Sequence, residues 1–475
     1  MTLNKSRYIH LIIMLAIVFG ISSLPPFGQI TPFGMKVIGA FVAILYGWIF
    51  FDLFWTSIFG FMIIPVLGLN TVAGTFAGGL GNQQVINVIL SMAFAVAIDF
   101  AGVTNIMANW LLQRRILQKS PWFLVCGILV GGMLMGAVGP AMATVFLLWS
   151  IVMKIAASCD IKKGEPILTF MITMIAMVVM TATLILPFRG SALVYVAFLK
   201  QVTDVMIPTL PFIVFATVML VCMLILTIFA AKVILKIDAS KFVLPETVLE
   251  ELRNANISKK EKNSFILLIV YIAILLIASL FTSLPGAAFI NKLGVGGVSA
   301  IATLILAVMN YEGKGYISLK AVFSNLDWSL IFLLAVTFPL ADLLKHADSG
   351  IMPTIMTFVR PLVADLGLTP FLIISIVILG IITQVTHNIV LGAMFIPFLL
   401  PVFAEMGGNI YLLWFALYFV LNTAYCTPAA SFQAALVFGH EATERKHAYI
   451  LGIVLLVVCW ISLVVVGIPL GNLIF

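Results

Sequence analysis

Charged residues are scarce in this 475-residue sequence: only 9% of the residues are Asp, Glu, Lys or Arg, whereas 63% are hydrophobic. An ordinary soluble domain has about 25% charged residues, and its small interior could not hide so much apolar surface. A lipid bilayer can, because one membrane-spanning helix needs about 20 apolar residues. The sequence therefore predicts an all-α polytopic membrane protein whose main partner is the lipid bilayer.

The residue patterns of metal, redox and nucleotide chemistry are also missing. The five cysteines show no Cys-x-x-Cys or Cys/His spacing, which favours free thiols over a zinc site or a disulfide framework. There is no Gly-rich nucleotide loop and no acidic or His cluster at a helix end. We therefore expect no cofactor and no metal. The net charge of +7 is spread over short loops, which predicts cytoplasmic anchoring and no nucleic-acid partner.

Apolar runs follow one another from the start of the chain to its last residues. The first run has no small-residue cleavage site, so we expect a retained helix and not a signal peptide. We expect about 11 transmembrane helices and two re-entrant hairpins. The expected spans are 9–24, 35–51, 54–69, 86–110, 166–200, 208–235, 264–284, 295–310, 325–344, 410–440 and 448–473, and the expected hairpins are 121–153 and 370–404.

The distribution of Lys and Arg predicts the orientation. With a cytoplasmic N-terminus, most of the 25 basic residues lie on the cytoplasmic side, as the positive-inside rule requires. This holds only if each hairpin returns to the side from which it entered. We predict a multi-pass protein of the cell inner (plasma) membrane with its C-terminus outside. The exceptions are Lys36, Lys200, Lys292, Lys345 and Arg360 outside and Arg189 within the membrane.

A long polar stretch, 236–263, separates two similar halves. Aligning Asp99 with Asp342 also aligns Ala192-Leu193-Val194-Tyr195 with Ala435-Leu436-Val437-Phe438. The predicted topology runs the two halves in opposite directions, a frequent plan of secondary transporters. The expected organisation is an N-terminal helix (1–34), a first inverted repeat (35–235, with broken helix 166–200), a cytoplasmic linker (236–263) and a second inverted repeat (264–475, with broken helix 410–440).

Both predicted hairpins turn at residues that suit a binding site. The first turns near Gly139 and Pro140, which cannot continue a helix comfortably. The second turns through side chains that nearly all form hydrogen bonds, and in hydrocarbon these must face water, protein or a ligand. Ligand or ion contact competes with a role as glue between helices. The candidate substrate-binding residues at the tips are Gly139, Pro140, Thr144, Thr383, Gln384, Thr386, His387 and Asn388.

The two broken helices supply the other candidates. Half-helix N-termini present free N–H groups to an anion, and loose carbonyls can hold Na⁺. Arg189 either binds a carboxylate or extends to the outer interface, and His387 is either structural or exchanges a proton. The substrate candidates here are Arg189, Ser191, Thr427, Pro428 and Ser431, and the ion candidates are Gly190, Asn388, Asn422 and Ala430.

The second half has Thr383-Gln384-Val385-Thr386-His387-Asn388-Ile389 before Met394-Phe395-Ile396-Pro397, and Thr427-Pro428 before Ala435-Leu436-Val437-Phe438-Gly439. These segments resemble the hairpin-tip and unwound-helix motifs of the divalent anion/sodium symporter family of di- and tricarboxylate carriers, part of the ion transporter superfamily. Asn388 matches the Asn of that family's Ser-Asn-Thr tip, while His387 and Ile389 replace its Ser and Thr. In the first half Gly139-Pro140-Ala141 lies where the other tip would be, so this chain resembles a divergent member.

The resemblance implies a homodimer of scaffold and transport domains that works by an elevator-like movement, with tips that bind substrate carboxylates and shape sodium sites. The leading hypothesis is a secondary active transporter of di- or tricarboxylates. It is coupled to Na⁺ or H⁺, with Na⁺ as the candidate coupling ion, or exchanges anions. The alternatives are a cation/proton antiporter of the same superfamily and an integral-membrane enzyme. An antiporter is expected to have acidic residues at the broken helices, where this chain has Arg, His, Asn and Thr.

Overall fold

The computed structural model describes residues 5–203, 207–246, 250, 257–311 and 313–475. Within these ranges the regular elements are helices, apart from the antiparallel pair β1 (Asn310–Tyr311) and β2 (Lys314–Gly315). The predicted all-α polytopic fold is confirmed. Ten helical segments of the described residues are long and apolar enough to cross a membrane.

The described part of the first half comprises eleven α-helices and two shorter turns. In order they are α1 (Lys5–Ser22), α2 (Pro32–Phe50), α3 (Leu53–Val66), α4 (Val72–Gly79), α5 (Gln83–Phe100), α6 (Val103–Leu112), the 3-10 turn η1 (Arg115–Gln118), α7 (Pro121–Val138), α8 (Ala141–Ser158), α9 (Pro166–Ala182), α10 (Gly190–Lys200), α11 (Thr209–Phe229) and the π turn η2 (Ala230–Ile234).

The second half begins with α13 (Lys259–Leu280), α14 (Ala287–Val308), α15 (Leu319–Ser324), α16 (Trp328–Lys345), the 3-10 turn η3 (Ala347–Ser349) and α17 (Ile351–Leu366). It continues with α18 (Leu368–Ile382), α19 (Asn388–Glu405), α20 (Ile410–Asn422), α21 (Phe432–Gly439), α22 (Arg445–Ser462), the π turn η4 (Leu463–Gly467) and α23 (Ile468–Ile474).

Some helix boundaries differ from the expected spans. The run 86–110 is not one helix, because Gly102 takes a left-handed conformation (φ +81°) and separates α5 from α6. The helix α3 has only 14 residues, about 21 Å, and is too short for a 30 Å hydrocarbon core. A capping box between Ser258 and Glu261 starts α13 inside the expected linker, part of which lies outside the described residues.

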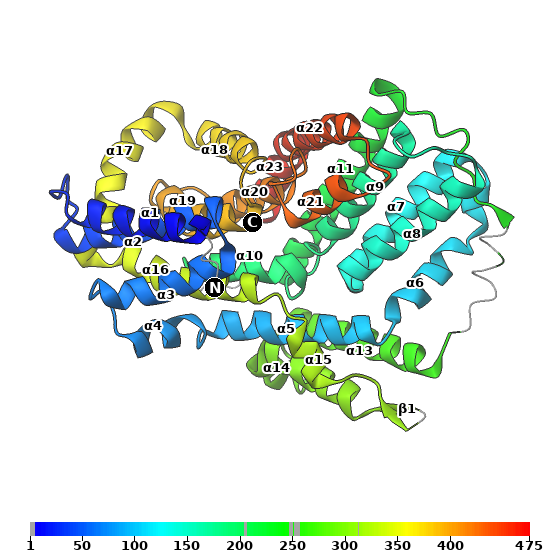
Figure 1. Cartoon of the computed structure of the whole chain (residues 1–475), viewed down its shortest axis with the longest axis horizontal. Coiled ribbons are helices and arrows are strands. Elements are labelled where there is room, and N and C mark those ends of the chain that lie inside the picture. The colour runs from blue at the N-terminus through cyan, green and yellow to red at the C-terminus, as the bar shows by residue number, and fades with distance from the viewer. Residues whose placement is uncertain (1–4, 204–206, 247–249, 251–256, 312) are drawn as a thin grey trace.

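The backbone is interrupted in the two hairpins and in the two long helices that follow them. The helices α7 and α8 stop and restart at Gly139–Pro140, and α18 and α19 at 383–387. The stretches 183–189 and 423–431 separate α9 from α10 and α20 from α21. In Figure 1 the hairpin α7–α8 lies toward one side of the molecule and α18–α19 toward the other, with α10, α20 and α23 between them.

The order of elements recurs in the two halves. Each half has a helix that ends near an Asp (α5, α16), then a second helix, a hairpin, a broken helix and a long helix that relaxes into a π turn. The packing recurs too, because α5 lies against α14 while α16 lies against α3. An inverted repeat would give this arrangement, in which the corresponding helix of each half packs against a helix of the other half. The repeat itself stays a prediction.

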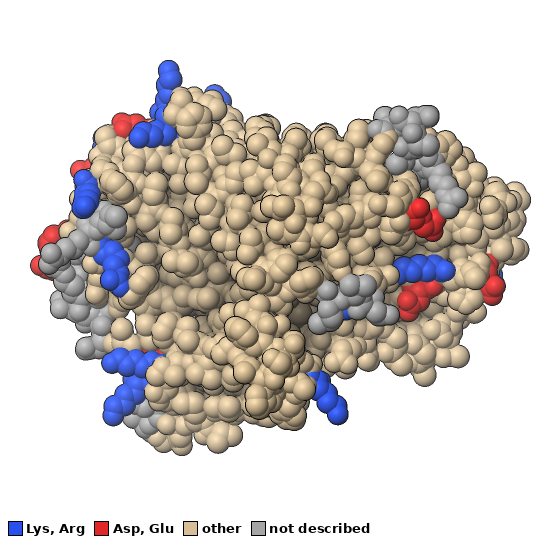
Figure 2. All heavy atoms as spheres, turned by 180° about the vertical axis from the view of Figure 1, so that it is seen from behind, with Lys and Arg blue, Asp and Glu red and all other residues tan. Residues whose placement is uncertain are grey.

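Charges are sparse over the middle of the face drawn in Figure 2, where the Lys and Arg side chains lie toward the edges. Large apolar side chains, such as those of Ile12, Val66, Phe229 and Leu473, are exposed on the molecule instead of buried. In water such a surface would be an aggregation hazard. It suits lipid, and the chain is a multi-pass membrane protein.

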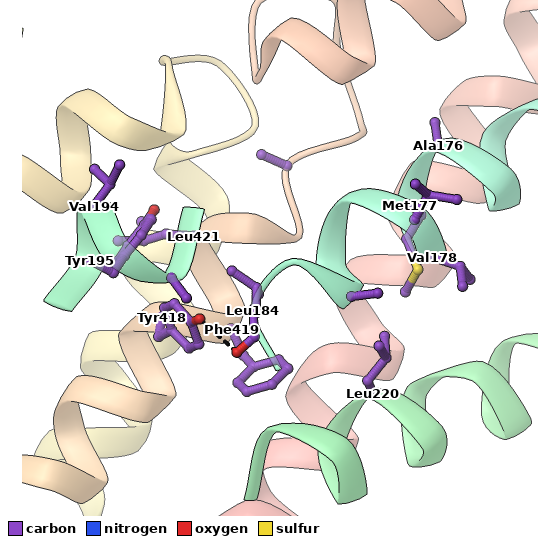
Figure 3. Close-up of a cluster of buried hydrophobic side chains, with 14 of the residues drawn as sticks. Ala176, Met177, Val178, Leu184, Val194, Tyr195, Leu220, Tyr418, Phe419 and Leu421 are labelled. Carbon is purple, nitrogen blue, oxygen red and sulfur yellow. Dashed lines mark hydrogen bonds between the residues drawn. The ribbon is translucent and has the colours of Figure 1, made fainter. Parts of the chain in front are cut away.

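The interior joins the two broken helices. Tyr418 of α20 is fully buried, and its hydroxyl donates a 2.8 Å hydrogen bond to the carbonyl of Leu184 in the stretch 183–189 (Figure 3). Trp414 donates from Nε1 to the carbonyl of Tyr195 in α10 at 3.2 Å. Both bonds link the first half to the second at the depth of the breaks, so the two broken helices form one packed unit.

The hairpin α7–α8 packs against α9 so closely that a glycine is required. A Cβ on Gly136 would lie 2.3 Å from the Val179 carbonyl oxygen, a backbone atom that cannot move aside alone. Gly136→Ala is expected to cost about 1–3 kcal/mol and to lower the melting temperature of the detergent-purified protein. The matched change Gly20→Ala meets nothing within 4 Å and should not lower it. Equal melting temperatures for the two variants would contradict this packing.

Candidate functional site

A cavity of about 310 Å³ lies where the tip of the first hairpin meets the joint of α9 and α10. Its volume falls in the range of small-molecule sites, about 300–1,000 Å³. The hairpin tip and the joint form one wall, and α5 and α13 form the other. The polar or helix-ending residues in its lining are Ser91, Asp99, Gly139, Pro140, Thr183, Arg189, Gly190, Ser191, Tyr195 and Tyr271.

Arg189 fixes the tip of the first hairpin. Its Nη1 donates to the carbonyl of Ala137 at 2.9 Å, and its Nη2 donates to the carbonyl of Gly139 at 3.0 Å. These carbonyls lie at the C-terminal end of α7, where helical partners run out because Pro140 follows. The guanidinium therefore lies in the cavity wall against the hairpin. The Arg189 side chain thus lies at the joint of α9 and α10, bonded to the tip of the first hairpin.

Two helix N-termini open on the same cavity without side-chain caps. The residue before α8 is Pro140 and the residue before α10 is Arg189, and neither side chain accepts a hydrogen bond from the first turn. The first-turn N–H groups are orphans of the helix, and they carry the positive end of the helix dipole. Thr144 is buried behind the tip, where its hydroxyl donates to the Pro140 carbonyl at 2.8 Å.

The electrostatics of this wall are positive. None of the ion pairs among the described residues includes Arg189. Asp99 also lines the cavity, but it is exposed at the C-terminal end of α5. An unpaired permanent charge at membrane depth is expensive unless a ligand of opposite charge neutralises it. The arrangement can bind an anion.

The opposite wall has hydroxyl groups that the sequence did not single out. Tyr271 of α13 bonds to Ser299 of α14 at 3.0 Å, and Ser299 bonds to Ser91 of α5 at 3.2 Å. Tyr271 and Ser91 both line the cavity. The available signal was the position of Tyr271 in the middle of a predicted span, away from the interfaces where tyrosines are usual.

The second hairpin tip uses its polar groups internally. The Gln384 amide donates to the carbonyls of Gly380 (2.9 Å) and Thr423 (3.0 Å). Its Oε1 accepts from the backbone N–H groups of Tyr425 (3.1 Å) and Cys426 (3.0 Å). The Thr427 hydroxyl donates to the Gln384 carbonyl. Gln384 therefore holds the tip to the unwound stretch 423–431, the structural role that competed with ligand binding.

Several other second-half candidates also bond to backbone groups of the same half. The Asn388 N–H donates to the Ala430 carbonyl at 3.1 Å, and Asn388 Oδ1 accepts from Ile389 at 2.9 Å. Ser431 caps α21 by accepting from Ala434. The Thr383 hydroxyl donates to the Leu421 carbonyl, and the Asn422 amide donates to the Tyr418 carbonyl. Thr386 is buried and Pro428 is exposed. His387 precedes α19, and its buried Nδ1 has no partner among the described residues.

The structure thus brings the first-half candidates together and keeps the second-half candidates apart from them. Gly139, Pro140, Arg189, Gly190 and Ser191 share the cavity. From the second hairpin and its broken helix, only Ile389 reaches the lining. The prediction from the sequence had favoured the second tip because that tip is rich in polar residues.

The chain is similar in sequence and in fold to known transporters. The family model described as citrate transporter, CitMHS, matches residues 11–420. A solved structure described as the Alcanivorax borkumensis YdaH transporter, with an unusual topology, is similar with a TM-score of 0.52 and 13% identity; the match covers 86% of this chain and 89% of that one. At this identity the likeness concerns the fold alone. The search of curated proteins gave no match.

Removing the Gln384 amide tests whether this side chain holds the second hairpin tip against the unwound stretch 423–431. Gln384→Leu leaves the Tyr425 and Cys426 N–H groups without acceptors, and each unpaired buried group costs about 1–3 kcal/mol. We expect faster labelling of Cys426, which is buried in the wild type, by a membrane-permeant maleimide in a variant that keeps only this cysteine. The control is Val385→Leu, because Val385 is exposed on the same tip. Unchanged labelling in Gln384→Leu would show that this amide does not hold the stretch.

Proposed function

We propose, from the premise that this chain belongs to the citrate transporter family, that it is a secondary active transporter of tricarboxylates such as citrate and of related di- and tricarboxylates. Family membership gives the broad activity, transport of organic anions like citrate. The finer assignments concern the site, the coupling ion and the movement.

One observation carries the assignment of the site: Arg189 lies between two uncapped helix N-termini in the same cavity and has no ion-pair partner among the described residues. A guanidinium and oriented backbone N–H groups suit a carboxylate. A transported cation would be repelled here, which disfavours the alternative of a cation/proton antiporter. The family and the structural neighbour are both transporters, which disfavours an enzyme.

The mechanism we propose is elevator-like alternating access. Each hairpin tip is bonded to an unwound stretch, through Arg189 in the first half and Gln384 in the second, and Tyr418 joins the two joints. Because these hydrogen bonds join the two hairpins and the two broken helices, the joined unit moves more easily as one rigid body than by opening a single tip. The scaffold in this proposal includes α5 and α13, which form the far wall of the cavity.

Coupling to Na⁺ or H⁺, or exchange of anions, completes the proposal. The carbonyl of Ala430 accepts one hydrogen bond, from the Asn388 N–H, and its second lone pair forms the candidate Na⁺ site together with Asn388 and Asn422. The Nδ1 of His387, which has no partner among the described residues, is the candidate proton carrier. Membership of the divalent anion/sodium symporter family in particular, and a homodimer, also belong to this proposal. Counterflow in proteoliposomes, with a panel of carboxylates with and without Na⁺ and a pH gradient, tests substrate and coupling together.

Arg189 is the decisive residue for that assay. Arg189→Gln keeps hydrogen-bonding capacity but removes the charge, so the KM for citrate should rise at least tenfold, about 1.4 kcal/mol of binding free energy. Arg445→Gln removes an exposed arginine at the start of α22 and should leave the KM unchanged. The assignment fails if both variants, at equal protein in the membrane, transport citrate with the wild-type KM.

A further inference from the structure

The far wall of the cavity carries a chain of three hydroxyl groups that no part of the transport mechanism above uses. Tyr271, Ser299 and Ser91 come from three different helices, α13, α14 and α5. The two links of the chain are 3.0 Å and 3.2 Å long. Ser299 is fully buried between the other two, which both face the cavity.

The surrounding residues hold this chain in place. The ring of Phe94 lies 4.3 Å from the ring of Tyr271, centroid to centroid, and fixes the tyrosine in the wall. Thr303 donates to the Ser299 carbonyl at 2.8 Å, one helical turn further along α14. Asn87 Oδ1 accepts from the Gly296 N–H and ties α5 to the same helix at 3.2 Å. The chain is therefore a preorganised part of the α5–α13–α14 wall.

In a row of hydroxyls the hydrogen bonds can all point one way along the row or all point the other way, whereas a single donor has no such alternative. Each hydroxyl has one proton to donate and lone pairs to accept with, and either atom of each link can be the donor. If Tyr271 donates to Ser299 and Ser299 to Ser91, the proton of Ser91 is left for the cavity. In the reverse direction the proton of Tyr271 is left. One end of the chain donates and the other accepts, whichever way it runs.

A neutral group that both donates and accepts matches such a chain, and a substrate hydroxyl is that group. Carboxylates are better served by the wall of Arg189 and the helix N-termini, where the positive charge lies. We propose, resting on the proposed transport of carboxylates, that Tyr271, Ser299 and Ser91 form a subsite for the hydroxyl of a hydroxycarboxylate. This subsite selects hydroxylated acids over analogues that lack the hydroxyl.

Discrimination follows from what an empty subsite costs. A site that hydrogen-bonds a substrate hydroxyl rejects the analogue without it, because its own polar groups are then left unpaired away from water. The wild type should therefore transport citrate with a higher kcat/KM than tricarballylate, the same tricarboxylate without the hydroxyl. The preference should also hold for malate over succinate if the wild type transports these shorter acids.

The test measures this ratio in proteoliposomes for Tyr271→Phe and Ser299→Ala. In both variants we expect the preference for citrate to fall at least tenfold while tricarballylate transport changes little. The matched control is Tyr316→Phe, which removes another buried tyrosine hydroxyl, bonded to Asn263 at 3.0 Å and outside the cavity lining. It should keep the wild-type ratio. Ser91→Ala removes the hydroxyl at the Ser91 end of the chain with the smallest change in volume. It replaces Tyr271→Phe in the test if that variant does not fold.

The outcomes separate the subsite from the transport function. If the wild type transports tricarboxylates and Tyr271→Phe, or Ser91→Ala in its place, keeps the full preference, the subsite is wrong while the proposed function stands. An equal loss for citrate and tricarballylate also overturns the subsite, because it indicates a general effect on the wall. A wild type that transports neither acid overturns the proposed function and, with it, this inference.

Discussion

Backbone groups that lose their helical partners inside lipid must find other partners, and this constraint organises the centre of the molecule. A helix that stops at membrane depth leaves carbonyls at its C-terminal end and N–H groups at the start of the next helix. This chain stops helices in that way in both hairpins and in both long helices that follow them. Where each set of orphaned groups finds its partners decides which part of the protein is structural and which part is open to a ligand.

The two halves meet the constraint differently. In the second half the Gln384 amide, the Asn388 side chain, Ser431 and the Ala430 carbonyl satisfy the interrupted backbone almost completely. In the first half Arg189 bonds to the two carbonyls at the end of α7, but no side chain among the described residues caps α8 or α10. The carbonyls at the end of α7 therefore have hydrogen-bond partners, whereas the first-turn N–H groups of α8 and α10 have no side-chain partner. These N–H groups need a hydrogen-bond acceptor. In the proposed function a carboxylate supplies that acceptor.

This division also explains how a chain with so few charges recognises an anion. One arginine does two tasks, because two of its N–H groups bond to the hairpin while its charge stays unpaired toward the cavity. Lysine could not replace it, since a point charge lacks the fork that spans two carbonyls. The opposite wall adds hydroxyls, with the exposed Asp99 at the C-terminal end of α5, so the two walls of the cavity suit different groups of the same molecule.

The sequence by itself determined the membrane environment and the helical class, and it located the breaks in the two hairpins and in the two long helices that follow them, but not the break at Gly102. Long apolar runs need lipid, Gly139-Pro140 and the Pro-containing stretches cannot continue a helix, and the polar run at 383–388 cannot sit in hydrocarbon unpartnered. Only the tertiary structure decided which break is free for a ligand, because that depends on partners distant in the chain. Gln384 finds the stretch 423–431, whereas Tyr271, Ser299 and Ser91 meet across three helices and face Arg189 over a cavity. A local sequence pattern cannot predict these contacts, because the hydrogen-bond partners of a group are decided only when distant segments pack together.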